Sequence, residues 1–215
     1  MLFRRERRGE TSFAGGVATE SAVVWRWPRG VAAAAARTCS VVVAAASRRR
    51  RDLSPAQDYG NAENDALDHG KGTMEAINLG NRTKPNGNWS RGAGRGPWIM
   101  ADLESGLWAG NESVNPQNVP ISSPFVTAFL KGRPGAFALK GGDARGGALT
   151  TLYDGPRPGG YGAMTKEGAV ILGTGGDNSN AAVGTFYEGA ITAGWTLDET
   201  DAAVHANIVA AGFGT

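Results

Sequence analysis

Short apolar runs alternate with turn-forming segments over most of the chain, from about residue 54 onward. Runs of this length, bounded by glycine, proline and asparagine, are typical of β-strands joined by tight turns. The 33 glycines also favour strands and turns over long helices. We therefore predict an all-β fold with strands over residues 73–79, 98–104, 124–131, 136–141, 147–153, 168–174 and 184–192.

One segment near the C-terminus departs from this pattern and predicts a short helix. Residues 196–199, Thr-Leu-Asp-Glu, fit a capping box, and Gly212 suits the end of the helix. Val204 and Ile208 are four residues apart, so they would lie on one helix face. We expect His205 to be an ordinary surface residue of this helix.

The predicted strand over residues 98–104 carries two acids. Side chains alternate across a strand, so Asp102 and Glu104 would share one face with Trp98 and Met100. The aliphatic residues between them would share the other face. We expect the first face to carry chemistry and the second to belong to the core.

A third acid, Asp177, follows another apolar run. Residues 169–180 indicate a buried strand that opens into a polar, glycine-rich tip. An acid at that tip could face Glu104 across a cleft. In the alternative interpretation, Asp177 caps a turn formed with residues 178–180.

The first 53 residues differ in composition from the rest. They hold 11 arginines against 4 acidic residues, whereas residues 54–215 hold 11 basic and 16 acidic residues. An Ala/Val-rich stretch over residues 31–46 is interrupted by Arg37, which fits neither a secretory signal nor a membrane span. We predict a disordered leader over residues 1–53 and one domain over residues 54–215.

Composition also narrows the possible chemistry. Cys39 is the only cysteine, and His69 and His205 are the only histidines, so a metal site or a Ser-His-Asp hydrolase is not indicated. The acidic balance of residues 54–215 does not predict nucleic-acid binding, which needs a basic surface to neutralise phosphates. We expect no metal, organic cofactor, nucleic acid or membrane as a partner.

Paired carboxylates meet the needs of glycoside hydrolysis. One acts as nucleophile or base, and a protonated carboxylic acid serves the leaving group of an oxocarbenium-like transition state. Spacing alone does not select the pair, because Asp143, Glu167 and Glu188 are also candidates.

Five strings of residues narrow the choice. They are Gly-Thr-Met-Glu-Ala-Ile-Asn (72–78), Gly-Pro-Trp-Ile-Met-Ala-Asp-Leu-Glu (96–104), Lys-Glu-Gly-Ala (166–169), Gly-Gly-Asp-Asn-Ser-Asn (175–180) and Gly-Thr-Phe-Tyr-Glu-Gly (184–189). Together they resemble the glycoside hydrolase family 54 α-L-arabinofuranosidases (arabinofuranosidase B), over about residues 58–211. The resemblance covers roughly the C-terminal half of that family's catalytic domain.

The resemblance implies a concanavalin-like β-sandwich, apparently incomplete, that releases terminal α-L-arabinofuranosyl residues with retention of configuration. It implies that Glu104 is the nucleophile and Asp177 the acid/base. The partner would be an arabinose-containing polysaccharide or oligosaccharide. The implied substrate-binding residues are Asp102, Trp89, Ser105, Gly176 and Met74. Two alternatives stay open: Asp102 satisfies backbone groups, and Trp89 packs in the core.

The sequence also departs from the family pattern. Pro55 and Ala56 stand where the family has two adjacent cysteines that form a disulfide under the sugar. Arg82 replaces another family cysteine, and Ser105 stands where the family usually has asparagine. The resemblance does not include the first half of the family's sandwich or its arabinose-binding module.

Three functional outcomes therefore remain open from the sequence: an active retaining arabinofuranosidase, a relative that only binds carbohydrate, and a truncated product without activity. Asn81, Asn88 and Asn111 begin glycosylation acceptor sequences. Together with the resemblance they indicate a secreted protein, although no signal-peptide pattern is evident.

Overall fold

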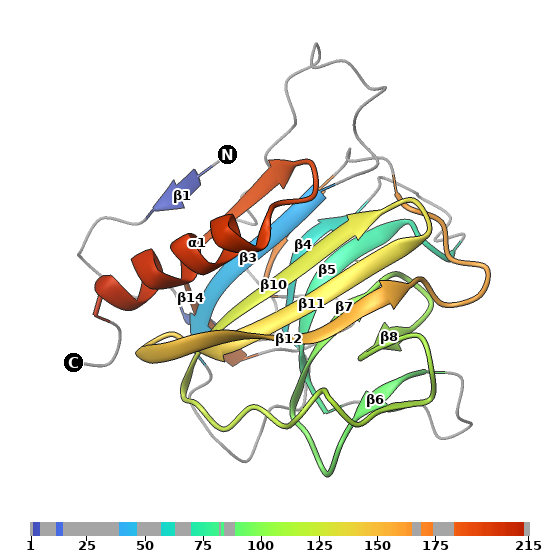
Figure 1. Cartoon of the computed structure of the whole chain (residues 1–215), viewed down its shortest axis with the longest axis horizontal. Helices are drawn as coiled ribbons and strands as arrows, with labels where there is room; N and C mark the ends of the chain where they lie inside the picture. Colours follow the sequence, from blue (N-terminus) through green and yellow to red (C-terminus); the bar gives the residue numbers. More distant parts are fainter. Residues whose placement is uncertain are drawn as a thin grey trace.

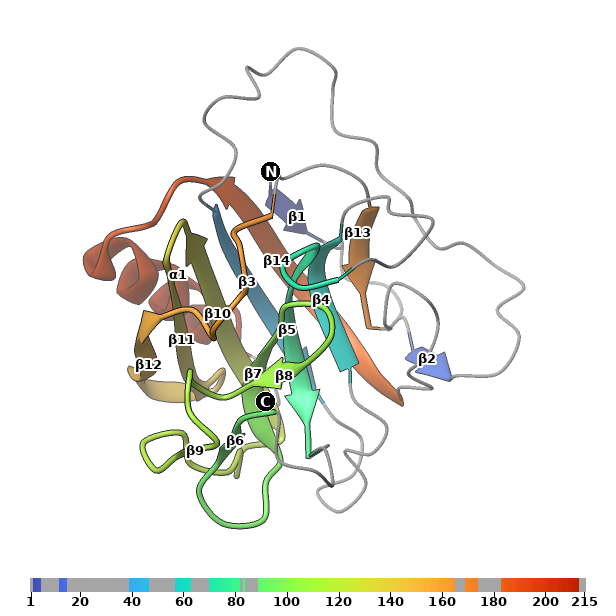
Figure 2. The ribbon, with the colours of Figure 1, turned by 90° about the vertical axis from the view of Figure 1, so that its right-hand side faces the viewer.

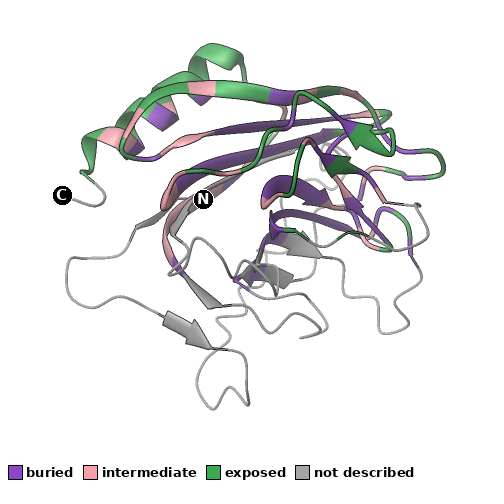
Figure 3. Ribbon diagram, turned by 90° about the horizontal axis from the view of Figure 1, so that it is seen from below, coloured by how far each residue is buried: buried purple, intermediate pink, exposed green. Residues whose placement is uncertain are grey.

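Two antiparallel sheets pack face to face, and a helix lies on the outside of the larger one (Figure 1, Figure 3). The computed structural model describes residues 2–4, 12–14, 39–46, 57–62, 70–81, 83, 89–164, 169–173 and 183–212. Within these residues, the prediction of a mainly β fold with one late helix is confirmed.

The larger sheet has seven strands in the order β1-β14-β3-β10-β11-β12, and β2 also pairs with β14. Every pair in it is antiparallel. Its strands are β1 (Leu2–Arg4), β2 (Ser12–Ala14), β3 (Cys39–Ala46), β10 (Phe125–Arg133), β11 (Ala136–Asp143), β12 (Gly146–Pro156) and β14 (Val183–Ala193).

The smaller sheet has five strands in the order β13-β4-β5-β7-β8 and lies across the larger sheet (Figure 2). A short parallel pair, β6 with β9, adjoins it. These strands are β4 (Gln57–Ala62), β5 (Met74–Gly80), β6 (Arg91–Gly92), β7 (Trp98–Asp102), β8 (Leu107–Trp108), β9 (Val114–Asn115) and β13 (Ala169–Leu172). All seven predicted strands are therefore found, with shifted ends.

Strand β3 corrects one expectation about the first 53 residues. It lies inside the larger sheet, paired with β10 on one side and β14 on the other. The prediction of disorder is therefore wrong for Cys39–Ala46, because this Ala/Val-rich run supplies a central strand of the sheet. The boundary predicted at residue 53 lies outside the described residues.

The main core lies between the two sheets. Side chains of β5 and β7 meet those of β10, β11 and β12 there, among them Ile77, Ile99, Leu130 and Leu139. Burying each such side chain contributes about 1.5–3 kcal/mol. The expected alternation along residues 98–104 is confirmed on the core side, where Ile99 and Leu103 are buried.

Helix α1 (Asp198–Ala210) packs on the outer face of the larger sheet, where Ile208 and Val204 contact the cluster around Phe129. The predicted capping box is wrong, because Leu197 occupies the N-cap and makes no side-chain cap hydrogen bond. Gly212, with a φ of 74°, follows the end of the helix as predicted.

His205 is not the surface residue that the sequence indicates. Its side chain is buried, and its Nε2 lies 3.2 Å from the carbonyl oxygen of Gly147. The helix face that carries His205 is turned towards the β11–β12 hairpin, where Gly142 leaves room for the imidazole ring. Helix periodicity alone could not reveal this contact.

Candidate active site

Glu104 lies in the tight turn between β7 and β8. Asp102 pairs with Leu107, and the backbone N–H of Leu103 donates to the carbonyl of Gly106 at 3.4 Å, which leaves Glu104 and Ser105 as a two-residue loop. The predicted strand over residues 98–104 therefore ends at Asp102. Glu104 is placed by a hairpin rather than by strand alternation.

Both loop residues have left-handed backbone conformations, with φ of 61° for Glu104 and 55° for Ser105. Two-residue hairpin loops often require positive φ at both positions, for which Asn-Gly is favoured. For residues with a Cβ this conformation costs roughly 1–2 kcal/mol each. Such strain persists only where surrounding contacts determine the conformation, and it is concentrated at functional sites.

Local hydrogen bonds hold the turn. The backbone N–H of Glu104 donates to Oδ1 of Asp102 at 3.1 Å, and that of Ser105 donates to Oε1 of Glu104 at 3.2 Å. The N–H of Gly72 donates to the carbonyl of Leu103 at 2.8 Å. Asp102 and Glu104 are half-buried, and Ser105 is exposed. The Asp102 carboxylate thus binds a backbone group of the turn.

Three aromatic side chains converge on Gly106, two residues after Glu104. A Cβ at this position would lie 2.8 Å from Nε1 of Trp108, 3.0 Å from the Tyr161 hydroxyl and 3.1 Å from Cδ1 of Trp89. Trp108 and Tyr161 pack edge to face with ring centroids 5.1 Å apart. The absence of a side chain at Gly106 therefore lets an aromatic wall close beside Glu104.

Trp89 and Met74 flank the turn on the outer face of the smaller sheet. Trp89 is half-buried and packs on a cluster that contains Trp98 and Met100. Ala76 of β5 pairs with Asp102. Met74 stands two residues before Ala76, at the end of β5 that lies beside the Glu104 turn. Met74 is buried. The structure thus brings together Glu104, Asp102, Ser105, Trp89 and Met74.

Asp177 and Gly176 lie outside the described residues. The strand that precedes them, β13, pairs with β4, and Ile171 joins Met74 and Ala76 in a cluster on the outer face of the smaller sheet. Because β13, β4, β5 and β7 are successively antiparallel, β13 and β7 run in opposite directions. The register places Leu172, the last residue of β13, in one row with Ile77 and Ala101, so β13 ends in the middle of the sheet and points away from the Glu104 turn.

A buried ion pair anchors the segment that carries Tyr161. Nη2 of Arg157 donates to Oε1 of Glu75, and both side chains are almost fully buried. Nε and Nη1 of Arg157 also donate to the carbonyls of Arg133 and Gly162, at 2.9 and 3.1 Å. The pair lies between the sheets, since a Cβ on Gly132 of β10 would collide with Glu75.

With this geometry in view, comparison with known proteins identifies the family. The family profile for "Alpha-L-arabinofuranosidase B, catalytic" matches residues 11–214. The chain belongs to this family.

Two curated arabinofuranosidases illustrate the likeness. The chain is 55% identical over 157 residues to the α-L-arabinofuranosidase of Hypocrea jecorina, and 56% identical over 162 residues to α-L-arabinofuranosidase B of Emericella nidulans. These matches cover 72% and 74% of this chain but 31% of each relative. The chain therefore spans about a third of the length of the curated relatives it matches.

Solved arabinofuranosidase structures share the fold. An arabinofuranosidase complexed with arabinofuranosyl-α-1,2-xylobiose matches with a TM-score of 0.74 and 39% identity, over 94% of this chain and 41% of that one. A Glu-to-Gln mutant soaked with 4-nitrophenyl α-L-arabinofuranoside matches with a TM-score of 0.71 and 44% identity, over 81% and 36% of the two chains. The predicted arabinofuranosidase β-sandwich is confirmed.

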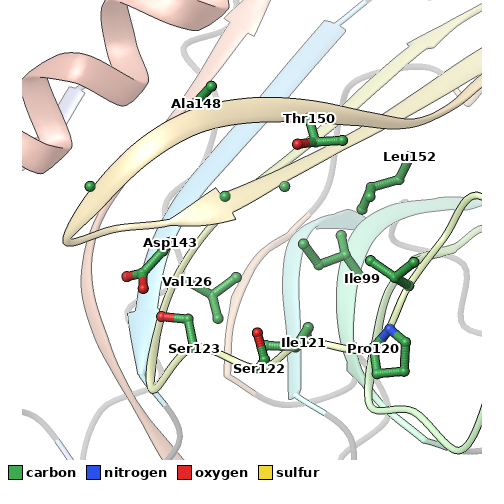
Figure 4. Close-up of a pocket in the computed structure, with 14 residues that line it drawn as sticks. Ile99, Pro120, Ile121, Ser122, Ser123, Val126, Asp143, Ala148, Thr150 and Leu152 are labelled. Carbon is green, nitrogen blue, oxygen red and sulfur yellow. The ribbon is translucent and has the colours of Figure 1, made fainter.

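One cavity of this arabinofuranosidase-family chain is lined by residues outside the Glu104 turn (Figure 4). It has a volume of about 320 Å³ and lies between the β11–β12 hairpin and the segment over residues 119–123. Ile99, Val126 and Leu152 form its apolar floor, and Asp143 stands at its rim. None of the described candidate site residues lines it.

The described residues hold no group of three or more His, Cys, Asp or Glu side chains arranged to bind a metal ion. Among the same residues, no helix is long and apolar enough to cross a membrane. Neither Gly106 nor Tyr161 was predicted from the sequence as a site residue. Gly106 could have been found from the sequence, because it lies near Glu104 and two tryptophans.

Proposed function

We propose that this chain is a retaining glycoside hydrolase that releases terminal α-L-arabinofuranosyl residues, with Glu104 as nucleophile and Asp177 as acid/base. The observation that carries the proposal is the Glu104 turn. A carboxylate is held there in a left-handed conformation, half-buried, beside a second carboxylate and an aromatic wall. The chain's family membership supplies the substrate class.

In the first step, the Glu104 carboxylate attacks the anomeric carbon of the arabinofuranose ring. The bond to the leaving-group oxygen breaks, and Asp177 gives that oxygen its proton. In the second step, Asp177 takes a proton from water, and the water oxygen attacks the anomeric carbon and displaces Glu104. Two inversions give net retention, and both carboxyl groups return to their starting states.

Retention sets a requirement on the Asp177 segment. The two carboxyl groups of a retaining glycosidase are about 5–5.5 Å apart. Although β13 points away from the Glu104 turn, the proposal requires the Asp177 carboxyl group to lie at that distance from Glu104. Ionised Glu104 at that distance would help keep Asp177 protonated for the first step.

The residues around the turn suit a small sugar ring. Trp89 offers apolar surface against sugar C–H groups, and the Asp102 carboxylate can accept hydrogen bonds from hydroxyls. Met74 is buried, so we assign it a supporting place beneath the sugar rather than an exposed contact. Ser105 adds an exposed hydroxyl, and Gly176 a backbone contact beside the acid. We assign these residues to binding of the terminal arabinofuranose.

The proposed substrates are arabinose-bearing polysaccharides and oligosaccharides. A relative of known structure is complexed with arabinofuranosyl-α-1,2-xylobiose, so arabinose-substituted xylan fragments are the first substrates to test. The curated relatives are named α-L-arabinofuranosidases, and we propose that this chain acts outside the cell, where such polysaccharides occur.

Release of p-nitrophenol from p-nitrophenyl α-L-arabinofuranoside tests the proposal. The full chain is compared with the Glu104→Gln and Asp177→Asn variants, and with Glu112→Gln, an exposed acid outside the site, as control. We expect turnover by the wild type and by Glu112→Gln, and loss of at least about a thousandfold in Glu104→Gln. Equal rates in all four proteins would overturn the assignment.

A protein that only binds carbohydrate gives a different result. It would show arabinose-dependent thermal stabilisation without product release, because a ligand that binds only the folded state raises its stability. A cooperatively folded chain with neither turnover nor a thermal shift would reject both activity and binding.

A further inference from the structure

Tyr161 reaches the Glu104 turn from a distant part of the chain. Its hydroxyl donates a hydrogen bond to the backbone carbonyl of Ser105 at 2.9 Å, across 56 positions of sequence. Ser105 is the second residue of the strained loop, and its amide already donates to Glu104. The Tyr161 hydroxyl therefore binds the residue that follows the proposed nucleophile.

The phenol remains a donor at the pH where a carboxylate nucleophile works. Burial raises the pKa of Tyr161, and although the Trp108 indole lowers it, the charges of Asp102 and Glu104 raise it further. The same charges favour the neutral phenol because a phenolate would be repelled by both carboxylates. The hydroxyl thus keeps its proton and its hydrogen bond to Ser105.

The backbone on which Tyr161 stands is fixed. Arg157, four residues earlier, binds the Glu75 carboxylate and the carbonyls of Arg133 and Gly162. Glu75 lies on β5 of the smaller sheet, Arg133 ends β10 of the larger sheet, and Gly162 follows Tyr161 in the chain. The N–H of Tyr161 also donates to the carbonyl of Pro158 at 3.1 Å. Because the Arg157–Glu75 pair is buried and holds this segment, the Tyr161 side chain cannot easily move with the Glu104 turn.

We propose that Tyr161 is a positioning residue for Glu104. Its hydroxyl holds the Ser105 carbonyl and thereby keeps the two-residue loop in the left-handed conformation that directs the Glu104 carboxylate to the sugar. The catalytic meaning of this inference rests on the proposed function. The structural link between Tyr161 and the turn rests on the hydrogen bond alone.

If Tyr161 had only a structural role, its ring contacts would account for its effect on the protein. The ring packs against Trp108 and lies 5.6 Å from the Lys71 ammonium. Tyr161→Phe keeps these contacts and removes the hydroxyl only. Tyr153→Phe is a matched control, because the Tyr153 hydroxyl also donates to a backbone carbonyl, that of Pro156 at 2.7 Å.

The experiment combines kinetics with amide hydrogen exchange on the full chain. Rates are measured with p-nitrophenyl α-L-arabinofuranoside for the wild type and both phenylalanine variants, at a temperature where all are folded. In Tyr161→Phe we expect kcat to fall about tenfold or more with little change in KM, because small misplacements of a reacting group are costly. We expect Tyr153→Phe to keep the wild-type kcat.

Amide exchange reports on the turn whether or not the chain is active. We expect faster exchange at Glu104 and Ser105 in Tyr161→Phe and unchanged exchange there in Tyr153→Phe. Unchanged exchange in Tyr161→Phe overturns the inference, and so does faster exchange with an unchanged kcat. An inactive wild type defeats the proposed function, whereas the exchange rates still decide whether Tyr161 holds the turn.

Discussion

Oδ1 of Asp102 accepts the backbone N–H of Glu104 at 3.1 Å, so one acid of the site holds the backbone of the other. The sequence left two roles open for Asp102, a sugar contact and a partner for backbone groups. The structure supplies a backbone partner for one oxygen of the carboxylate, and our proposal assigns the carboxylate a sugar contact as well. Both roles can therefore coexist.

Two substitutions separate these roles of Asp102. Asp102→Asn keeps an oxygen that can accept the Glu104 N–H, so we expect its free energy of unfolding to stay near that of the wild type. Asp102→Ala removes the acceptor and should lower that free energy by about 1 kcal/mol. Both variants should lose activity, because both remove the charge beside the sugar. Urea unfolding that finds equal stability for Asn and Ala would refute the backbone role.

Gly106→Ala should disrupt the aromatic wall. The added methyl would lie 2.8–3.1 Å from atoms of Trp108, Tyr161 and Trp89, closer than normal contact. We expect a loss of about 1–3 kcal/mol in unfolding free energy and a larger proportional loss of kcat/KM. Thermal unfolding and p-nitrophenol release measure the two effects.

Gly159→Ala serves as control for this change, because no atom lies within 4 Å of a Cβ at Gly159. It should stay within about 0.5 kcal/mol of the wild type. Similar losses in the two alanine variants would show that the effect of Gly106→Ala is a general cost of replacing glycine rather than a collision.

Glu75→Gln should destabilise the chain strongly. It leaves the Arg157 guanidinium buried between the sheets without its counter-charge, which costs about 3–5 kcal/mol in comparable pairs. Chemical denaturation measures the loss. In contrast, Arg145→Ala breaks the exposed pair with Asp143, and we expect no measurable change in Tm. A Glu75→Gln variant as stable as Arg145→Ala would contradict the anchoring role of the buried pair.

Asp198 at the start of α1 should make stability depend on acid pH. Hydrogen bonds from Lys140 and Lys131 lower the pKa of its carboxyl below the ordinary 3.8. A carboxyl whose pKa is lowered on folding stabilises the fold above the unfolded-state pKa, and this stabilisation is lost as the pH falls through the folded-state value. Because Asp198 is largely exposed, the effect should be small.

Asp198→Asn is therefore expected to be less stable than the wild type at neutral pH, and the difference should shrink below about pH 3.8. Unfolding curves at neutral and acidic pH measure this difference. A gap between the two proteins that stays constant over this range would mean that the charge of Asp198 does not contribute through its pKa.

The strand pattern could be predicted from the sequence because each apolar run carries its own turn residues. β10 and β11, for example, are joined by Pro134 and Gly135, a pair that strongly favours a turn. β3 was not predicted, because arginines flank its Ala/Val run and Arg37 interrupts the stretch before it. Pairing with β10 and β14 stabilises a segment whose local composition does not indicate a strand.

The Glu104 turn could not be predicted, because Glu-Ser is not a turn-forming pair and the alternation of residues 98–104 continues through it. Its conformation depends on partners from elsewhere, including Gly72 and Tyr161. Tyr161 itself gave no signal, since a hydrogen bond across 56 positions leaves no local pattern. The family resemblance indicated Glu104 as a candidate nucleophile, and the structure shows which groups hold its turn.

The most direct test of Glu104 as nucleophile is to trap the covalent intermediate. In the Asp177→Ala variant of this chain, p-nitrophenolate can leave without an acid, but water attack is slowed because the base is missing. We predict that tandem mass spectrometry of the quenched, digested protein finds an anhydroarabinose adduct on Glu104. An adduct on another carboxylate, or an inverted first product from the wild-type chain, would contradict the proposal.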